Sequence, residues 1–401
     1  MTRPLDGVKI LDLSNIIAGP LCTYQLGLMG ADVIKIERPG TGDLARKMGM
    51  DPERGRKQMG VSFLAMNAGK KSITLNLQQE RGRNIFKQLA SGADVVFENF
   101  RPGVMARLGL GYDTLKAINP SLIYCAVSGF GQDGPLSKRP AYDQIIQGYS
   151  GLMSLTGPED GDPYRAGYTA CDAMGAMTAA FTVTAALLRK NQTSEGAFID
   201  VSMLDATMAT MASWVISNHL NTGNEPQRLG NESHSAAPSG SFPTKDGQIN
   251  IVNNEQKQFE ALCDAIDQPD LKSHPLFADR DERFKNKDAL RAELVPVLAQ
   301  KTSAEWEEVL SAAGIPAAQI YTVPEILRHP HTVARNILET FDDVPGTNQG
   351  ATVAARGYRF IGETVEKNTP PPELGQDTDT VLQALGLNDE DIRALRENGT
   401  V

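Results

Sequence analysis

The 401-residue chain has few cysteines and histidines, and they form no pattern that would let them act together. Its four cysteines have no C-x-x-C pair and stand apart at Cys22, Cys125, Cys171 and Cys263. Disulfide frameworks and cysteine-rich zinc sites need paired spacings, so neither is indicated. The five histidines show no metal-ligand spacing beyond the H-P-H at 329–331, so we expect no bound metal.

The usual nucleotide-binding and serine-hydrolase motifs are also missing. The strand-like run VKILDLS is followed by NIIAGP, which lacks the G-x-G-x-x-G that lets a backbone approach a pyrophosphate closely. There is no P-loop Gly-Lys-Ser and no G-x-S-x-G elbow. We therefore expect no nicotinamide, flavin or other tightly bound cofactor, and no serine chemistry.

An excess of positive charge and a long hydrophobic run are absent as well. The net charge is −10 and the pI is near 5.2, which argues against a nucleic-acid or anionic-membrane partner. The N-terminal MTRPLDGVKILDL lacks the apolar stretch of a signal peptide, and the weakly polar run 173–188 is shorter than a bilayer span. These features predict a cytoplasmic protein.

What the chain does contain is a regular alternation of β-rich and helical segments. Six β-rich runs are expected at 8–14, 33–37, 72–77, 94–100, 122–130 and 198–203. Helical patterns such as QERGRNIFKQLA and VMARLGLGYDTLKAI lie between them. This alternation predicts an α/β fold with a doubly wound parallel sheet in a large domain, 1–221.

A second, smaller domain is expected from a change of texture near residue 222. The stretch TGNEPQRLGNESHSAAPSGSF is rich in Gly, Ser, Asn and Pro, which is typical of a linker or loop. A strand-like GQINIVNN and charged helical segments follow it. We expect a small α+β domain over 222–323.

Cations and glycine turns gather at the expected carboxyl ends of the strands, where parallel sheets bind ligands. These ends carry IERPGTGD, ENFRPG and SGFGQDGP. Most such charges are simply solvated, but arginine beside a glycine turn can also grip phosphate. The cations are Arg38, Arg46, Lys47, Arg54, Arg56, Lys70, Lys71, Arg101, Arg107, Lys138 and Arg139.

Asp172 stands at the head of a run of small and apolar residues, CDAMGAMTAAF. Aspartate is a favoured helix N-cap, which gives Asp172 an ordinary structural interpretation. The small residues Ala173, Gly175 and Ala176 instead suggest open backbone N–H groups that would suit an anion or an oxyanion. The local sequence leaves a cap and a nucleophile both open.

Taken together, several motifs resemble those of the class III CoA-transferases, the carnitine dehydratase or bile-acid-inducible F type. They are LDGVKILDLSNIIAGP, GADVIKIERPGTGD, NAGKKSITLNL, ENFRPG, SGFGQDGP, RPAYDQIIQGYSG, RAGYTACDAMGAM, GAFIDVSMLDA and TPPPELGQDTD. The resemblance implies a Rossmann-like large domain to which a C-terminal segment, 324–401, returns. It also implies an interlocked homodimer whose substrates are an acyl-CoA and a small carboxylic acid.

The resemblance also assigns residues and a mechanism. It implies that Asp172 attacks the acyl-CoA thioester and carries the CoA as an aspartyl thioester. It implies that coenzyme A is bound by Arg38, Leu75, Asn76, Asn99, Phe100, Arg107, Arg139, Tyr142 and Asp143. Arg38 and Arg107 would contact the phosphates, although backbone or loop-stabilising roles remain open for Asn99 and Tyr142.

Substrate choice rests on two further positions. Ile17 stands where oxalate-using members have glutamine, which argues against oxalate or formyl-CoA. The resemblance itself, through the acids that are frequent in the family, implies a dicarboxylic acid such as succinate or a methyl-branched relative. Arg165 would pair with a distal carboxylate or form a structural salt bridge.

Two other activities remain as alternatives. An α-methylacyl-CoA racemase-like isomerase would need a histidine where PAYD places Tyr142, a poor base near neutral pH. The other alternative is a catalytically idle CoA-binding protein.

Overall fold

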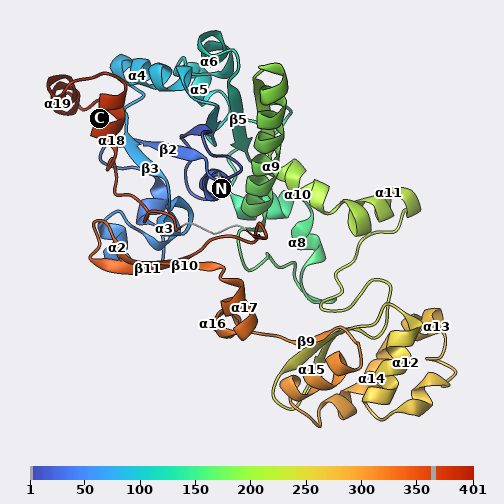
Figure 1. Cartoon of the computed structure of the whole chain (residues 1–401). Helices are drawn as coiled ribbons and strands as arrows, with labels where there is room; N and C mark the ends of the chain where they lie inside the picture. The colour runs from blue at the N-terminus through green and yellow to red at the C-terminus, as the bar shows by residue number, and fades with distance from the viewer. Residues whose placement is uncertain (1–2, 363–366) are drawn as a thin grey trace. The chain divides into compact units, whose positions relative to one another are not determined.

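The structure is a computed structural model that describes residues 3–362 and 367–401, and its centre is a six-stranded parallel sheet (Figure 1). The strands are β1 (Lys9–Asp12), β2 (Asp32–Glu37), β3 (Lys71–Thr74), β4 (Val95–Glu98), β5 (Ile123–Ser128) and β6 (Ala197–Ser202). Their order, β3-β2-β1-β4-β5-β6, reverses between β1 and β4, as in Rossmann-type sheets. The predicted Rossmann-like α/β fold is confirmed.

One face of the sheet is covered by α1 (Ala18–Leu28) and α9 (Ala170–Thr193). Leu26 of α1 and Val183 of α9 share a buried cluster with strand residues such as Ile10 and Phe97. All four are wholly buried, so this layer fixes α9, and with it Asp172, against the sheet.

The opposite face is covered by α4 (Glu80–Ser91), α5 (Val104–Arg107), α6 (Tyr112–Ile118), α18 (Thr378–Ala384) and α19 (Asp389–Glu397). Figure 1 shows α18 beside β3. There the Ser72 N–H donates to Asp377 Oδ2 at 2.8 Å and the Thr74 N–H donates to Thr378 Oγ1 at 3.0 Å. Because β3 is an edge strand, these bonds satisfy backbone groups that would otherwise be unpaired.

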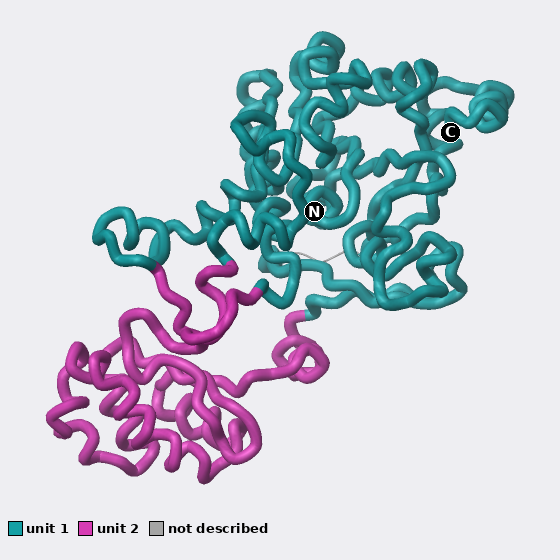
Figure 2. The backbone as a smooth tube through the Cα atoms, turned by 180° about the vertical axis from the view of Figure 1, so that it is seen from behind, with its two compact units in different colours: residues 1–152, 165–225, 336–401 teal, residues 153–164, 226–335 magenta. Residues whose placement is uncertain are grey.

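Contacts within the chain divide it into two compact units, drawn in Figure 2. The larger is Met1–Leu152, Arg165–Glu225 and Asn336–Val401, and the smaller is Met153–Tyr164 and Pro226–Arg335. The larger unit also contains η1 (Leu44–Lys47), α2 (Pro52–Arg56), α3 (Val61–Asn67), α7 (Asp143–Tyr149), α10 (Met203–Thr210), η2 (Ala212–Ser217), α11 (Asn218–Thr222), β10 (Leu338–Val344) and β11 (Gln349–Ala354). The short helix α8 (Leu152–Leu155) has its first residue in the larger unit and its other residues in the smaller one. The domain boundaries expected at 222 and 323 stay predictions.

The smaller unit has its own antiparallel sheet and its own core. The strands are β7 (Ser239–Pro243), β8 (Gln248–Val252) and β9 (Ala317–Gln319). The helices are α12 (Gln256–Ala265), η3 (Pro269–Lys272), α13 (Arg280–Lys285), α14 (Lys287–Leu298), α15 (Ser303–Ala312), α16 (Val323–Arg328) and α17 (Pro330–Arg335). Phe242, Phe259 and Trp306 pack in this core, which gives the α+β character expected from the sequence.

Helix α9 is longer than the sequence suggested. It runs for 24 residues and is apolar enough, by length and composition, to cross a membrane. The expectation that this segment is shorter than a bilayer span was therefore wrong, because the helix continues through Cys171 and through Lys190. Its inner side packs against β5, β6 and α1, however, and a core helix passes the same test.

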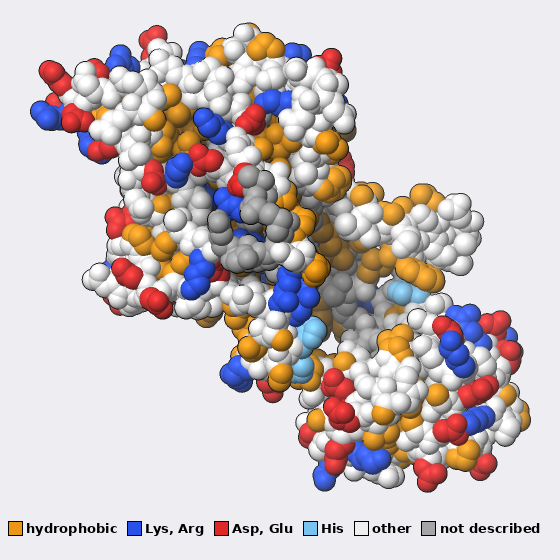
Figure 3. All heavy atoms as spheres, viewed as in Figure 1, with side chains coloured by type: hydrophobic (Ala, Val, Ile, Leu, Met, Phe, Trp, Pro, Cys, Tyr) orange, Lys and Arg blue, Asp and Glu red, His pale blue; other side chains and the backbone are white. Residues whose placement is uncertain are grey.

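Charged side chains lie on the surface and also in the interior. On the face drawn in Figure 3, Lys and Arg side chains are interspersed with Asp and Glu. Six charged residues near the β1–α1 loop are instead buried: Asp12, Lys35, Glu37, Asp43, Arg46 and Lys70. Ion pairs join Asp12 to Lys70, Lys35 to Asp43 and Glu37 to Arg46, with nitrogen–oxygen distances of 3.0, 3.0 and 2.7 Å.

Candidate active site

The loops that follow β1 and β4 meet where the strand order reverses. Asn99 Oδ1 accepts the Asn15 N–H at 2.8 Å, and Asn99 Nδ2 donates to the Asn15 carbonyl at 2.8 Å. Both ends of the Asn99 amide are thus engaged by backbone. The structure gives Asn99 the loop-holding role that the sequence left open beside CoA binding.

Asp172 lies in the first turn of α9, but it does not cap the helix. The N-cap residue is Thr169, and Asp172 is the third helical residue. The cap is supplied by Asp143, whose Oδ1 accepts the N–H groups of Cys171 at 2.8 Å and Asp172 at 3.2 Å. The N-cap interpretation of Asp172 was wrong, because a carboxylate from α7 occupies that place.

The same contacts overturn the expectation of open N–H groups at the start of α9. Asp143 takes two of them, and the Ala173 N–H donates to the Thr169 carbonyl at 3.1 Å. The small residues have a packing reason instead. A side chain on Gly175 would come within 3.0 Å of Met203 Cγ on α10.

Burial, and to a lesser degree the negative charge of nearby Asp143, together raise the pKa of the Asp172 carboxyl to about 7. No described residue donates a hydrogen bond to the Asp172 carboxylate. Its oxygens are therefore free to react. With a pKa of about 7, both the protonated and the ionised form of the Asp172 carboxyl are present near neutral pH.

Asp172 lines a cavity of about 220 Å³, which we call the Asp172 pocket. Its wall combines the β1–α1 loop, the ends of β4 and β5, and the segment before α7. The lining residues are Asn15, Ile16, Ile17, Ala18, Asn99, Phe100, Arg101, Pro102, Val127, Ser128, Gly129, Ser137, Arg139, Pro140, Ala141, Tyr142, Asp172 and Met203.

A second cavity, of about 620 Å³, lies on the other side of Asn15 and Phe100, and we call it the Arg38 pocket. Two exposed cations, Arg38 and Lys47, stand in its wall. The lining residues are Leu13, Asn15, Ile36, Glu37, Arg38, Thr41, Gly42, Leu44, Lys47, Leu75, Asn76, Leu77, Gln78, Phe100, Val104 and Leu108. Because Asn15 and Phe100 line both cavities, the two pockets adjoin.

Most of the residues predicted from the sequence are brought to these pockets. The Arg38 pocket receives Arg38, Leu75, Asn76 and Phe100. The Asp172 pocket receives Ile17, Asn99, Phe100, Arg139, Tyr142 and Asp172. Arg107, Asp143 and Arg165 are not among the described residues that line either pocket.

Those three residues differ in their surroundings. Arg107 is exposed on α5, one helical turn from Val104 of the Arg38 pocket. Asp143 is buried, and Gln147 Nε2 donates to its second oxygen at 2.6 Å. Arg165 is exposed in the segment before α9.

Sequence reasoning missed the buried charges beneath the site. Arg46 and Lys70 were grouped with loop cations, but Arg46 is paired with Glu37 and Lys70 with Asp12. Burial alone would raise the pKa of Asp12, and the Lys70 and Lys35 ammonium groups hold it below its usual value. One sequence signal could have identified Asp43 as a structural residue. It follows G-T-G and precedes LARK, and aspartate favours the helix N-cap, which is the position that Asp43 occupies before η1.

The comparison with known families is decisive. The sequence profile described as CoA-transferase family III matches residues 5–378. The chain belongs to this family. It is a class III CoA-transferase, an enzyme that moves coenzyme A between an acyl-CoA and an acid.

Characterised relatives of this CoA-transferase resemble it over most of its length. The chain is 42% identical to acetyl-CoA:oxalate CoA-transferase of Acetobacter aceti, over 84% of this chain and 85% of that protein. It is 35% identical to succinyl-CoA:glutarate CoA-transferase of Homo sapiens, over 100% and 90%. With succinyl-CoA–D-citramalate CoA-transferase of Chloroflexus aurantiacus the identity is 34%, over 98% and 97%.

Solved structures agree. A CAIB/BAIF family protein from Brucella suis superposes with a TM-score of 0.84 at 33% identity, covering 96% of this CoA-transferase and 100% of that chain. Rv3272 from Mycobacterium tuberculosis gives a TM-score of 0.83 at 32% identity, covering 94% and 99%.

Proposed function

We propose that Asp172 is the nucleophile of this CoA-transferase. Its carboxylate attacks the thioester carbonyl of the donor and expels CoA thiolate, leaving a mixed anhydride. The thiolate then attacks the aspartyl carbonyl, which releases the donor acid and forms an aspartyl-CoA thioester. The acceptor carboxylate attacks that thioester, and the same steps in reverse give the new acyl-CoA and free Asp172.

The observation that carries this proposal is the position of Asp172. Among the described residues that line the Asp172 pocket, it is the one carboxylate. Its oxygens are not engaged in capping α9, and the larger cause of its raised pKa is burial, although the residue keeps some exposure. Exclusion of water protects an acyl anhydride from hydrolysis.

We further propose that CoA lies across both pockets. Arg38 and Lys47 would hold phosphates, with Leu75 and Asn76 beside the adenosine, because guanidinium and ammonium groups form charge-assisted hydrogen bonds with phosphate oxygens. Phe100 would contact the pantetheine, since it borders both cavities. Arg139, Tyr142 and the Asp172 carboxylate would face the thiol end, and Arg107 would reach the phosphates from α5.

The acids exchanged are proposed to be dicarboxylates. The relatives described above are named for oxalate, glutarate and D-citramalate, all dicarboxylic acids. Succinyl-CoA is our proposed donor, because two of those three names include it. The argument from Ile17 against oxalate conflicts with the name of the 42% identical relative, so oxalate belongs in the first acid panel.

A homodimer is proposed as the working form. The outer side of α9 exposes Met177, Phe181 and Leu188, each more than half exposed, along a cavity of about 870 Å³. Apolar side chains clustered in this way favour a protein partner over water. Light scattering after gel filtration tests this, with Phe181→Glu expected to shift the mass towards a monomer.

Mass spectrometry tests the mechanism directly. The protein is incubated with succinyl-CoA, treated with hydroxylamine or borohydride, and digested. We expect a CoA adduct, or its trapped derivative, on the peptide that contains Asp172, and none in Asp172→Asn. Transfer without any adduct on that peptide would contradict the covalent mechanism.

A further inference from the structure

The loop between β1 and α1 contains a strained residue. Ile16 has φ +71°, a left-handed conformation that is unfavourable for a β-branched residue. In the described part of the chain, the other non-glycine residues with positive φ are Gln58, Ser194, Asp267, Asn336 and Asn348, and none of them is β-branched. Ile16 also lines the Asp172 pocket.

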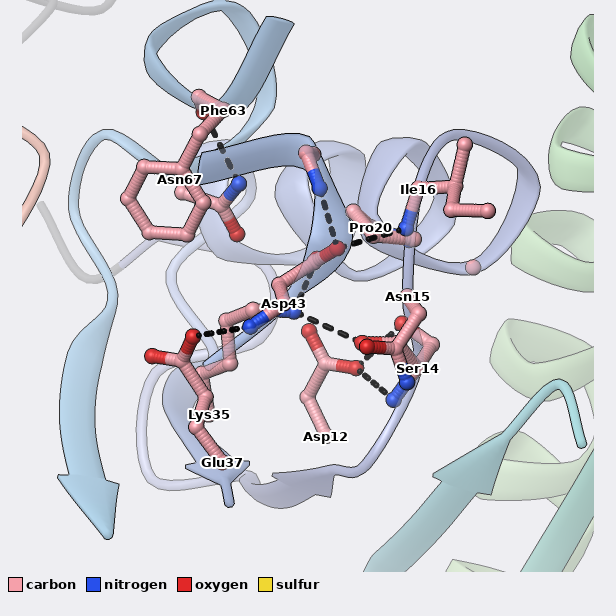
Figure 4. Close-up of polar contacts among 12 residues, drawn as sticks. Asp12, Ser14, Asn15, Ile16, Pro20, Lys35, Glu37, Asp43, Phe63 and Asn67 are labelled. Carbon is pink, nitrogen blue, oxygen red and sulfur yellow. Dashed lines mark hydrogen bonds and ion pairs between the residues drawn. The ribbon is translucent and has the colours of Figure 1, made fainter. Parts of the chain in front are cut away.

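The conformation of Ile16 is held by a buried carboxylate, shown in Figure 4. Asp43 Oδ1 accepts the Ile16 N–H at 2.9 Å, and the same oxygen accepts the Ala45 N–H at 2.9 Å. Asp43 is 1% exposed, so this hydrogen bond is shielded from water. A charged acceptor in such surroundings forms a strong hydrogen bond.

A wholly buried lysine fixes Asp43 in turn. Lys35 Nζ lies 3.0 Å from Asp43 Oδ2 and donates to the Ser14 carbonyl at 2.7 Å. Lys35 therefore joins the carboxylate to the same loop, two residues before Ile16. The Asp43 N–H donates to Glu37 Oε1 at 2.9 Å, and this bond anchors the backbone of the loop that carries Asp43.

These contacts connect the walls of the two pockets. Asp43 belongs to the segment that supplies Arg38, Thr41 and Lys47 to the Arg38 pocket. Its side chain accepts a hydrogen bond from Ile16, which lines the Asp172 pocket. Asp43 itself lines neither pocket among the described residues. A buried ion pair contributes little stability compared with apolar packing of the same volume. Because the Lys35–Asp43 pair lies next to the strained residue Ile16, its position points to a role in holding the pocket wall.

We propose that Asp43 is a positioning residue: by accepting the Ile16 N–H it keeps the Asn15–Ala18 wall in its left-handed turn and so sets where the acyl group lies relative to Asp172. This inference rests on the proposed function of Asp172. Without the carboxylate, Ile16 relaxes towards negative φ and the peptide leading to Ile17 rotates. The reacting carbonyl is then misplaced.

A double-mutant cycle tests this role. Asp43→Ala is expected to lower kcat by about 10- to 100-fold, because small misplacements of reacting groups are costly. In an Ile16→Gly background, Asp43→Ala is expected to lower kcat by no more than about twofold, since glycine adopts positive φ without help. A difference of about twofold is the scatter within which independent substitutions are additive. In the matched Ile16→Ala background, which also lacks the side chain but disfavours positive φ, the full loss is expected to remain.

The cycle separates positioning from a general structural role. A purely structural Asp43 would give equal losses in the Gly and Ala backgrounds, and that result overturns the proposal, as does a kcat for Asp43→Ala within twofold of the unmodified protein. If Asp43→Ala does not fold, Lys35→Met is combined with it in all three backgrounds, because this removes the Ile16 acceptor without leaving the buried Lys35 ammonium unpaired.

Failure of the proposed function has a different signature. Transfer by the unmodified protein without an Asp172 adduct would contradict the assignment of Asp172 as the nucleophile. The double-mutant cycle of Asp43 and Ile16 would still report their coupling, because it compares values of kcat. Deuterium exchange gives a readout that does not depend on activity: the peptide containing Ile16 should exchange faster in Asp43→Ala than in the unmodified protein. Unchanged exchange would also overturn the proposal.

Discussion

Asp143 Oδ1 lies within hydrogen-bond distance of the Asp172 N–H, at 3.2 Å, so one carboxylate caps the helix on which the other is presented. Because Asp143 caps α9, the Asp172 carboxylate is not needed for capping, and the negative charge of Asp143 lies close to it. Both effects bear on the reactivity of Asp172, because the neighbouring charge raises its pKa and the free oxygens can attack a thioester.

The first prediction concerns the pH dependence of transfer. Because the ionised carboxylate is the nucleophile and its pKa is about 7, kcat/KM should rise as the pH increases through 7. In Asp143→Asn the rise should move to lower pH but remain above the ordinary aspartate range, since burial is the larger cause. A profile that does not move would show that the Asp143 charge has no effect on Asp172.

The second prediction concerns stability. The folded pKa of Asp172 lies above its unfolded value of 3.8, so the unfolded state loses this proton first and the ionised group lowers stability as the pH rises from about 4 to 7. Asp172→Asn should therefore raise the free energy of unfolding at pH 8, by on the order of 1 kcal/mol for a partly exposed group, and leave it unchanged at pH 4. Urea denaturation at both pH values measures this, and an equal change at both would contradict it.

The third prediction concerns CoA phosphates. Arg38→Ala and Lys47→Ala should each weaken CoA binding by about tenfold, because each removes a charge-assisted hydrogen bond. Isothermal titration calorimetry at low and high salt provides the measurement. Arg189→Ala, an exposed change near the C-terminal end of α9 at a residue that lines neither pocket, is the matched control. Affinities equal to the control would remove both residues from the binding site.

The fourth prediction separates two roles for Asn99. Because its amide is engaged with the backbone of Asn15, Asn99→Ala should lower the free energy of unfolding by about 1–3 kcal/mol, the cost of leaving such groups unpaired. A direct CoA contact would instead weaken CoA binding at unchanged stability. Thermal denaturation and calorimetry on the same preparation distinguish the two results.

Sequence reasoning was most successful where local pattern and chain topology agree. The six strands appear at the expected runs, because the β-branched and aliphatic residues of β1 to β5 are mostly buried on both faces of the sheet, while the edge strand β6 is buried mainly on one. The segment 104–118 was expected to have a helical pattern without a break being named, but Gly109 has φ +67° and the segment forms two helices, α5 and α6, on either side of it. Glycine positions with positive φ are hard to recognise without the tertiary structure.

The site was harder to predict, because its polar side chains have partners that are distant in sequence. Asn15 and Asn99 are 84 residues apart, and Asp143 caps a helix that begins 27 residues later at Ala170. No spacing rule connects such pairs. The same holds for Asp43, whose carboxylate reaches back 27 residues to Ile16.

The attachment of α18 to the edge strand β3 has a consequence for biosynthesis. Thr74 and Thr378 are 304 residues apart, so at roughly 5–20 residues per second the ribosome needs about 15 to 60 s after making β3 to supply its cover. Throughout that interval the nascent sheet has an open edge, and the part of its apolar face that α18 and α19 cover stays exposed, which favours engagement by a chaperone. The backbone of Asn76, a lining residue of the Arg38 pocket, also gains its partner, the Thr400 carbonyl, only at the end of translation. A slowly translated or prematurely released chain would be prone to aggregate.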